Sequence, residues 1–438
     1  MSFPRYPQYK DSGVDWLGQV PAHWEVKPFK RVFRERDERS AKGEETLLSV
    51  SAYTGVSPRS DIIDEGDQLT RADSLEGYKV CHSDDLVMNI MLAWNRGLAF
   101  TQYEGIVSPA YCVFSVTDGS VPSFLNYLVR SDNYTLYFKA FSAGVIDSRL
   151  RLYPDVFGSL NCCLPPLPEQ REIAGLLDRE TGKIDALVAE QERLLELLKE
   201  KRQAVISHAV TKGLNPNAPL KPSGLDWLGD VPAHWDTRRV KSVSTFLTSG
   251  PRGWSERISE VGELFIQSGD LNDTLGLDLE TAKRVQVEGD AETARTQLRN
   301  GDVVVCITGA KTGNVAICSG LSETAYVNQH LCLVRPSEEV VPRFLGMLLK
   351  SRVGATYFDL SQYGLKQGLS LENVKEAPVP LPPLSEQRAI VAHLDAATAQ
   401  FDALTAAVER ALALLQERRT ALISAAVTGQ IDVRSAAV

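Results

Sequence analysis

Long apolar runs are absent from this chain of 438 residues. No stretch approaches the roughly 18–20 consecutive apolar residues that a membrane-spanning helix needs, and the first residues lack the pattern of a secretory signal. The seven cysteines are scattered without a Cys-x-x-Cys pair, although Cys162 and Cys163 are adjacent. This spacing argues against a zinc site and indicates free thiols. We therefore predict a cytoplasmic protein that holds no metal.

Catalytic motifs are also missing. The chain has no G-x-G-x-x-G motif before a helix, no H-E-x-x-H, no G-x-S-x-G, and only six histidines. Residues Gly309–Asn314 resemble a phosphate-binding loop, but that loop needs glycine where this chain has Ala310 and Val305. Residues Asn215–Ala218 do not match the Asn-Pro-Pro-aromatic motif of amino-methyltransferases. We predict that the chain has no catalytic residue and binds no cofactor.

Positive charge is in deficit, with 47 Lys and Arg against 56 Asp and Glu and a formal charge of −9. A protein that binds nucleic acid is often basic, because Lys and Arg make the phosphate contacts. The acidic balance therefore counts against nucleic-acid binding, unless positive clefts are local or a partner supplies those contacts.

What the sequence does contain is a duplication. Residues 12–24 read SGVDWLGQVPAHW and residues 223–235 read SGLDWLGDVPAHW, with only two differences. Residues 164–214 and 381–431 form a second repeated pair, identical at 28 of 51 positions. The inserts between them show little similarity to each other. This pattern is typical of a symmetric frame that presents two different domains.

The second repeated segment predicts a long helix in each copy. About 40 residues run without proline, and apolar side chains recur in steps of three, four and seven, as in a coiled coil. One helix cannot bury this stripe alone, so we predict that the two helices pack antiparallel about a pseudo-two-fold axis. The helix pattern by itself also allows a simple dimerisation coiled coil. The stripe of the first copy consists of Ile173, Leu177, Ile184, Leu187, Leu194, Leu198 and Val205, with Gln191 interrupting one step.

Two further features of the repeats have structural interpretations. Trp16, His23 and Trp24 recur in the second copy, and we interpret them as a turn that anchors the start of a domain through buried aromatic area rather than as a site. Glu169 and Glu386 begin the long helices, where the helix dipole favours negative charge.

Each insert predicts one α/β domain of about 140 residues. Strand-like runs lie at Leu86–Met91, Tyr111–Val116, Val303–Ile307 and His330–Val334, and helical stretches lie near 123–141 and 342–357. The predicted fold class is α+β, with two α/β domains separated by two long helices that form an antiparallel coiled coil. The predicted boundaries are 1–163 and 223–380 for the domains, 164–213 and 381–431 for the helices, and 214–222 for a proline-rich linker.

Polar loops in both inserts carry residue types that can read bases. Asn and Gln pair with adenine edges, and Arg and Lys pair with guanine edges. Taken one by one, these loops are also compatible with ordinary polar turns. The candidates are Asn95, Arg96, Arg149 and Arg151 in the first insert, and Lys311, Thr312, Asn314, Gln362, Tyr363, Lys366 and Gln367 in the second.

The paired DWLG-x-VPAHW segments, the paired LPPL-x-EQR sequences and the two dissimilar inserts together resemble the specificity subunit of type I restriction–modification systems, over nearly the full chain. The resemblance implies two target-recognition domains on double-stranded DNA, each reading one half of a split, asymmetric target. It implies a helical spacer that fixes the number of unread base pairs. It also implies methyltransferase subunits, two by our expectation, which dock on the helices and supply S-adenosylmethionine and adenine-N6 chemistry. ATP-driven restriction subunits would join them for cleavage.

Two other functions were weighed against this one. A scaffold whose inserts bind protein partners and never touch DNA is the alternative that the acidic composition favours and the family pattern disfavours. A self-contained methyltransferase would need a cofactor motif, and the sequence offers none.

Overall fold

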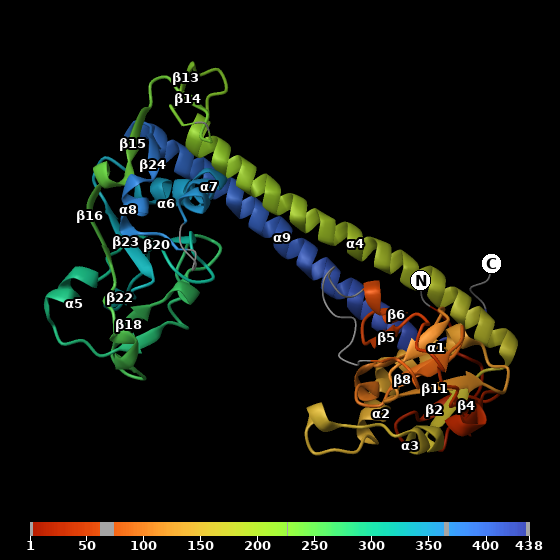
Figure 1. Ribbon diagram of the computed structural model, residues 1–438. Helices are drawn as coiled ribbons and strands as arrows, with labels where there is room; N and C mark the ends of the chain where they lie inside the picture. The colour runs from red at the N-terminus through yellow and green to blue at the C-terminus, as the bar shows by residue number, and fades with distance from the viewer. Residues whose placement is uncertain (1–2, 62–73, 226, 363–367, 435–438) are drawn as a thin grey trace. The chain divides into compact units, whose positions relative to one another are not determined.

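The computed structural model describes residues 3–61, 74–225, 227–362 and 368–434. The chain divides into two compact units, Met1–Gln191 with Arg410–Val438 (unit 1) and Glu192–Glu409 (unit 2). The long helices α4 (Leu167–Lys212) and α9 (Leu384–Val427) each contribute one part to each unit. Each unit therefore combines one insert with helical segments from both repeats (Figure 1).

Unit 1 is built on a four-stranded antiparallel sheet of order β4-β11-β8-β9. The inner strand β8 is buried at all four residues, three of which are the apolar Leu86, Val87 and Met88. The elements of this unit before α4 are β1 (Tyr9–Asp11), β2 (Gln19–Pro21), β3 (Glu25–Pro28), β4 (Phe33–Arg36), β5 (Leu48–Ser51), β6 (Gly55–Pro58), β7 (Lys79–Cys81), β8 (Leu86–Asn89), β9 (Leu98–Phe100), β10 (Gly105–Val107), β11 (Tyr111–Val116), α1 (Pro122–Arg130), α2 (Asp132–Ala140), α3 (Pro154–Ser159) and β12 (Asn161–Leu164).

Unit 2 repeats this architecture with the sheet order β16-β23-β20-β21. The two inserts of unlike sequence thus share the order of one four-stranded sheet, although unit 2 also has a second four-stranded sheet, of order β17-β19-β18-β22. The elements between the long helices are β13 (Leu220–Pro222), β14 (Asp230–Pro232), β15 (Asp236–Arg239), β16 (Ser244–Ser249), β17 (Ile258–Ser259), β18 (Glu263–Ile266), β19 (Lys283–Val285), α5 (Ala291–Thr296), β20 (Val303–Cys306), β21 (Val315–Ile317), β22 (Ala325–Val327), β23 (Leu331–Pro336), α6 (Pro342–Lys350), α7 (Arg352–Ser361), α8 (Leu371–Glu376) and β24 (Pro378–Leu381).

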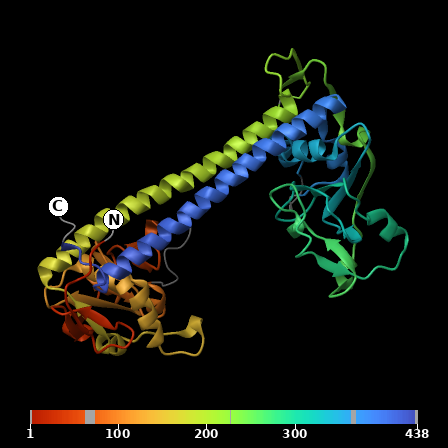
Figure 2. The ribbon, with the colours of Figure 1, turned by 180° about the vertical axis from the view of Figure 1, so that it is seen from behind.

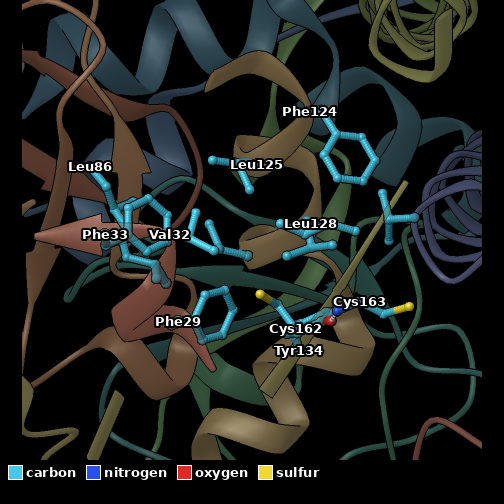
Figure 3. Close-up of a cluster of buried hydrophobic side chains, with 14 of the residues drawn as sticks. Phe29, Val32, Phe33, Leu86, Phe124, Leu125, Leu128, Tyr134, Cys162 and Cys163 are labelled. Atoms are coloured by element: carbon cyan, nitrogen blue, oxygen red, sulfur yellow. Dashed lines mark hydrogen bonds between the residues drawn. The ribbon is translucent and has the colours of Figure 1, made fainter. Parts of the chain in front are cut away.

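The core of unit 1 joins the sheet, α1, α2 and the ends of both long helices. Phe29, Leu128 and Tyr134 are fully buried at its centre (Figure 3). Ile173 of α4 and Val427 of α9 belong to the same core cluster. Unit 2 has the corresponding arrangement, since its core includes residues from the end of α4 and the beginning of α9. The helix ends are therefore integral parts of the two folded cores.

The two long helices run antiparallel in both units. In unit 1 the beginning of α4 shares a core with the end of α9, and Asp185 pairs with Arg419 at 2.8 Å. In unit 2 Arg202 pairs with Asp402 at 2.5 Å. Asp185 and Arg202 of the first repeat correspond to Asp402 and Arg419 of the second, so the same ion pair is made twice. The predicted fold class, with its antiparallel coiled coil and internal duplication, is confirmed.

Each predicted helical stretch of the inserts is in fact two helices. Ser131 separates α1 from α2, because its hydroxyl donates to the Leu128 carbonyl at 2.8 Å and accepts from the Tyr134 N–H as the N-cap of α2. Ser351 makes the corresponding interactions between α6 and α7. A serine hydroxyl at this place competes with the helical backbone and ends the first helix.

Candidate nucleic-acid interface

Equivalent glutamates fasten each domain to the start of a long helix. The Glu169 carboxylate is buried and accepts from the Trp24 indole N–H at 3.0 Å and from the Tyr6 hydroxyl at 2.6 Å. Burial and the neighbouring Glu169 raise the pKa of Tyr6 above its usual range. The other carboxylate oxygen lies 2.7 Å from Nε2 of His23. The predicted structural role of the repeated histidine–tryptophan turn is confirmed.

The same carboxylate interaction occurs in unit 2. Glu386 accepts from the Trp235 indole N–H at 3.1 Å and lies 2.8 Å from Nε2 of His234. The glutamates therefore do more than favour the helix dipole, which was the only role that the sequence indicated.

The glutamine that follows each of these glutamates binds the backbone at the start of an insert helix, α1 in unit 1 and α6 in unit 2. Gln170 Oε1 accepts from the Val121 N–H at 2.8 Å, just before α1, and its amide donates to the Pro165 carbonyl at 3.0 Å. Gln387 bonds to the Val341 N–H at 2.7 Å, just before α6. Sequence reasoning overlooked these residues, although their identity in both repeats was the signal that could have revealed them.

Within each unit, two of the loops that carry candidate residues meet beside the sheet. In unit 1 the Leu152 N–H donates to the Ile90 carbonyl at 2.9 Å, which joins the segment before α3 to the loop after β8. In unit 2 the Leu369 N–H donates to the Ile307 carbonyl at 2.8 Å, which joins the segment before α8 to the loop after β20. The loops chosen separately in the two inserts are thus topological equivalents.

The loop between β8 and β9 leaves one of its two candidates unpaired. Asn95 is exposed, and its side chain makes no hydrogen bond to any residue in the described ranges. Arg96 adopts a left-handed conformation with φ 60° and pairs with Asp132 at the start of α2. Of the two, Asn95 has the side chain that is free to contact a ligand.

The loop between α2 and α3 also carries one unpaired candidate. Arg149, in the 3₁₀ turn Asp147–Arg149, is exposed, and its guanidinium contacts no partner among the residues that the structure describes. Arg151 donates to the Leu150 carbonyl at 2.9 Å, and its backbone exchanges two hydrogen bonds with Ala143.

In unit 2 the candidate side chains after β20 hold a neighbouring loop. Lys311 Nζ donates to the Gly269 and Leu271 carbonyls at 3.1 and 3.2 Å, and the Asn314 amide also donates to Leu271, at 3.2 Å. The Thr312 hydroxyl donates within its own loop, at 2.7 Å. These side chains therefore organise the loop surface, while Lys311 keeps an exposed positive charge.

The remaining candidates of unit 2 follow α7. Gln362 ends this helix and donates to Asp359 at 3.2 Å. Tyr363, Lys366 and Gln367 lie outside the described residues.

Two half-buried cations that sequence reasoning missed support the loops. Arg130, the last residue of α1, donates to the Ala52 carbonyl at 2.8 Å and the Leu98 carbonyl at 3.0 Å, and burial lowers its pKa to about 10. Lys350 ends α6 and donates to the Asn272 carbonyl at 2.7 Å. The available signal was a basic residue followed by serine inside both predicted helical stretches, Arg130–Ser131 and Lys350–Ser351.

A polar cavity of about 810 Å³ opens in unit 1 beside the loop that Arg130 holds. Its walls include Tyr53, Arg96 and Asn126 from the insert and Arg419 from α9. Tyr53 is 93% exposed at the turn between β5 and β6, and the search for polar base readers missed it. The cavity shows that the insert and α9 share one polar surface within this unit.

Two kinds of site have no counterpart in the part of the chain that the structure describes. No group of three or more His, Cys, Asp and Glu side chains is placed to hold a metal ion, and every described helix is too short or too polar to cross a bilayer. All seven cysteines are free and buried. Burial raises the pKa of the Cys163 thiol to about 12, so this thiol stays protonated.

Comparisons of sequence agree on one family. Residues 232–413 match the family model described as the type I restriction modification DNA specificity domain. The chain is 30% identical over 282 residues to the type I restriction enzyme EcoBI specificity subunit of Escherichia coli, covering 62% of this chain and 58% of that protein. It is 24% identical over 349 residues to the EcoKI specificity subunit of Escherichia coli K12, covering 77% and 70%. The match spans less than two thirds of the first relative's length.

Solved structures share the fold over nearly the whole chain. A chain from a study of complex assembly and conformational transition of the type I R-M system has a TM-score of 0.71 at 19% identity, covering 93% of this chain and 98% of that one. The HsdS subunit from Thermoanaerobacter tengcongensis has a TM-score of 0.54 at 20% identity, covering 94% and 98%. At these identities the likeness concerns the fold.

Proposed function

We propose that this chain is a specificity subunit of a type I restriction–modification system, the family that its sequence relatives and its family-model match share, and that it is the sequence-specific DNA-binding subunit of such a complex. Each target-recognition domain reads one half of a bipartite, asymmetric target, and the long helices set the number of unread base pairs between the halves. The observation that carries the proposal is that two inserts of unlike sequence share one sheet order. Each insert is attached to its long helix by an equivalent glutamate and glutamine.

The base-reading surface in this proposal is the pair of adjoining loops in each unit. Asn95 and Arg149 suit contacts with base edges, because both are exposed and carry unpaired donors. The other candidates position the loops or neutralise phosphates. They are Arg96, Arg151, Lys311, Thr312, Asn314 and Gln362, whereas Tyr363, Lys366 and Gln367 remain candidates for contacts with DNA. The domain boundaries 1–163 and 223–380, the helices 164–213 and 381–431 and the linker 214–222 remain part of the proposal.

The long helices provide the docking surface for partner subunits. Leu187 and Leu404 occupy equivalent positions in the two repeats, as do Leu197 and Leu414, and all four are exposed. Exposed apolar side chains on a helix mark contacts with other proteins when they cluster. Because each leucine occurs twice, the surface suits two copies of one partner. We infer two methyltransferase subunits, which supply S-adenosylmethionine chemistry, with restriction subunits joining for cleavage. The chain contributes no catalytic group and acts in the cytoplasm.

Deleting the gene tests the function directly. Methylated adenines are mapped across the host genome with and without the gene. We expect one bipartite motif to lose its methylation and all other motifs to stay unchanged. If every methylated motif survives the deletion, the proposal is wrong, and a scaffold that never contacts DNA becomes the better account.

The charge of −9 leads to a second test. Because the chain supplies few net positive charges, we expect weak DNA binding by the chain alone and tight, specific binding after the methyltransferase is added. Gel-shift titrations of each component measure this difference. Strong specific binding by the isolated chain would reject our explanation of its acidity.

A further inference from the structure

The loop between α2 and α3 of unit 1 ends in an apolar tip. Val145 is 99% exposed and Ile146 is 53% exposed. In Figures 1 and 2 this segment, drawn in gold, extends away from the sheet of its unit. Neighbouring β-branched side chains in water forgo the burial that stabilises such residues elsewhere in the unit. The tip is therefore suited to bind a partner that has an apolar surface.

The loop holds this tip in a defined shape. Ala143 and Arg151 exchange backbone hydrogen bonds of 2.8 and 2.9 Å, which close the loop at its base. A Cβ atom at Gly144, where φ is 149°, would lie 2.7 Å from the Arg149 carbonyl oxygen, so glycine is needed for the closure. Lys139 and Asp147 form a 2.9 Å ion pair across the loop. The apolar tip is thus presented on a closed, braced structure.

Positive charge follows the tip along one arm of the loop. Arg149 is exposed without a partner among the described residues, and Arg151 lies two residues further on. The one carboxylate of the loop, that of Asp147, is already paired with Lys139. An apolar tip with positive charge on the adjoining arm complements a surface on which apolar groups lie beside phosphates.

The DNA major groove offers such a surface. There the 5-methyl group of thymine is the one apolar group on a base edge, and phosphates line both sides of the groove. The major groove, about 12 Å wide, admits a helix or a two-stranded ribbon, whereas the minor groove of about 6 Å does not. The loop closed by Ala143 and Arg151 has two antiparallel arms, like a short ribbon.

We propose that Val145 and Ile146 enter the major groove of the half-site read by unit 1 and contact the 5-methyl group of a thymine. This contact distinguishes a thymine from the other bases at one position, while Arg149 contacts a neighbouring base edge. The inference rests on the proposed function and adds a specific apolar contact to its polar base readers.

Uracil substitution isolates the methyl group. In the full chain assembled with its methyltransferase partner, each thymine of the target is replaced in turn by uracil, which removes only that methyl. We expect the affinity of the wild-type complex to fall about three- to tenfold at one or two adjacent positions in one half-site. Val145→Ala combined with Ile146→Ala should bind the thymine and uracil duplexes equally, at the lowered affinity.

Leu136→Ala is the matched control, since Leu136 is an exposed apolar residue of α2 outside the tip. This variant should keep the full preference for thymine, and unchanged thermal melting of all variants shows that each is folded. The inference is overturned if the wild type tolerates every uracil, if the tip variant keeps the preference, or if 2-aminopurine fluorescence shows the tip unstacking bases as a wedge. If the wild-type complex binds no bipartite target, the proposed function itself is contradicted.

Discussion

At the scale of single residues, the carboxylates that begin the long helices carry a large share of each domain's attachment. Glu169 accepts hydrogen bonds from two buried donors, the Trp24 indole and the Tyr6 hydroxyl. Removing the acceptor leaves both donors without a partner, and each such loss costs about 1–3 kcal/mol. We expect Glu169→Ala to lower the free energy of unfolding of unit 1 by ~2–4 kcal/mol in urea titrations.

Glu172 provides the control for this substitution, because it is exposed on the same helix turn and its counterpart in the second repeat is Ala389. Glu172→Ala should change the free energy of unfolding by no more than ~0.5 kcal/mol. Similar losses in the two variants would show that the buried hydrogen bonds do not matter.

A histidine in unit 1 makes stability depend on pH. His82 bonds to Glu38 at 3.0 Å and to Glu104 at 2.7 Å, and these hydrogen bonds raise its pKa. The folded unit therefore holds the proton more tightly than the unfolded chain. The resulting stabilisation is complete below the ordinary pKa of about 6.5 and is lost as the pH rises through the raised value. We therefore expect the urea midpoint of unit 1 to decrease as the pH rises from about 6.5 through the raised pKa of His82.

His82→Gln should remove that part of the pH dependence. The effect is small, because the pair is exposed to solvent and screened. Urea midpoints of both proteins, measured in steps from pH 5.5 to pH 8 (roughly the range where histidine titrates), give the comparison. An identical slope in the variant would exclude His82 as its source.

Arg149 is the residue whose loss should weaken DNA binding most clearly among the sequence-derived candidates. A guanidinium on a guanine edge contributes about 1–3 kcal/mol of discrimination, so Arg149→Ala should reduce specific affinity roughly 5- to 150-fold and relax the preference at one base pair. Binding of the assembled complex to a set of single-base target variants measures both effects. Arg31→Ala removes another exposed cation, outside the loops, and should leave the preference intact. Equal effects of both variants would show that Arg149 contributes only sequence-independent attraction to DNA and reads no base.

Residue types in loops were predictable from the sequence, but the pairing of their side chains was not. Asn95 was chosen because its loop follows a strand-like run and Arg149 because it lies just before the repeated helical segment, and both are exposed. Arg96 was chosen by the same rule, yet it pairs with Asp132 of α2. That partner lies 36 positions away along the chain, so only the folded arrangement brings the two charges together.

At the scale of elements, the repeated ion pairs define the register of the coiled coil. Asp185 pairs with Arg419 in unit 1, and the equivalent Arg202 pairs with Asp402 in unit 2. Such exposed pairs contribute ~0.2–1 kcal/mol each. Asp185→Arg alone should destabilise the helices by placing two cations together, and adding Arg419→Asp should restore the pair.

A double-mutant cycle on thermal or urea unfolding gives the coupling energy between these positions. We expect a favourable coupling of ~0.5–1 kcal/mol, and the same sign for the matched pair in unit 2. Additive effects at both pairs would mean that the charges do not interact across the helices.

The long helices and inner strands were predicted well because each follows a simple period. The four buried residues of β8 and the start of the predicted α4 stripe, where Ile173 and Ile184 are buried, are strong, local signals. Further along α4 the predicted stripe was wrong, because Leu187 and Leu194 are 45% and 39% exposed. The end of the first helix at Ser131 was missed, because the sequence does not tell a serine that caps a helix from a serine inside one. The two differ only in which backbone groups the folded chain places around the hydroxyl. The equal sheet order of the two inserts was also hidden, since their sequences share little.

At the scale of the whole molecule, a duplicated frame carries two different sets of loops. The frame depends on the antiparallel pairing of α4 and α9, and we propose that their common length determines the gap in the target. If the helices set the gap, shortening both of them equally changes the gap and leaves the two half-sites unchanged.

Residues 187–193 of α4 and 404–410 of α9 are equivalent seven-residue segments that lie between the two ion pairs. Deleting both removes one heptad from each helix and keeps Asp185 opposite Arg419 and Arg202 opposite Asp402. The helices become shorter by about 10 Å at ~1.5 Å per residue, which corresponds to about three base pairs. Deleting only residues 187–193 leaves helices of unequal length and should abolish specific methylation.

Mapping methylated adenines in cells that carry the double deletion is the most direct measurement of this account. We predict a motif with both original half-sites and a gap about three base pairs shorter. Methylation of the original motif with its gap unchanged would contradict the spacer role of the helices.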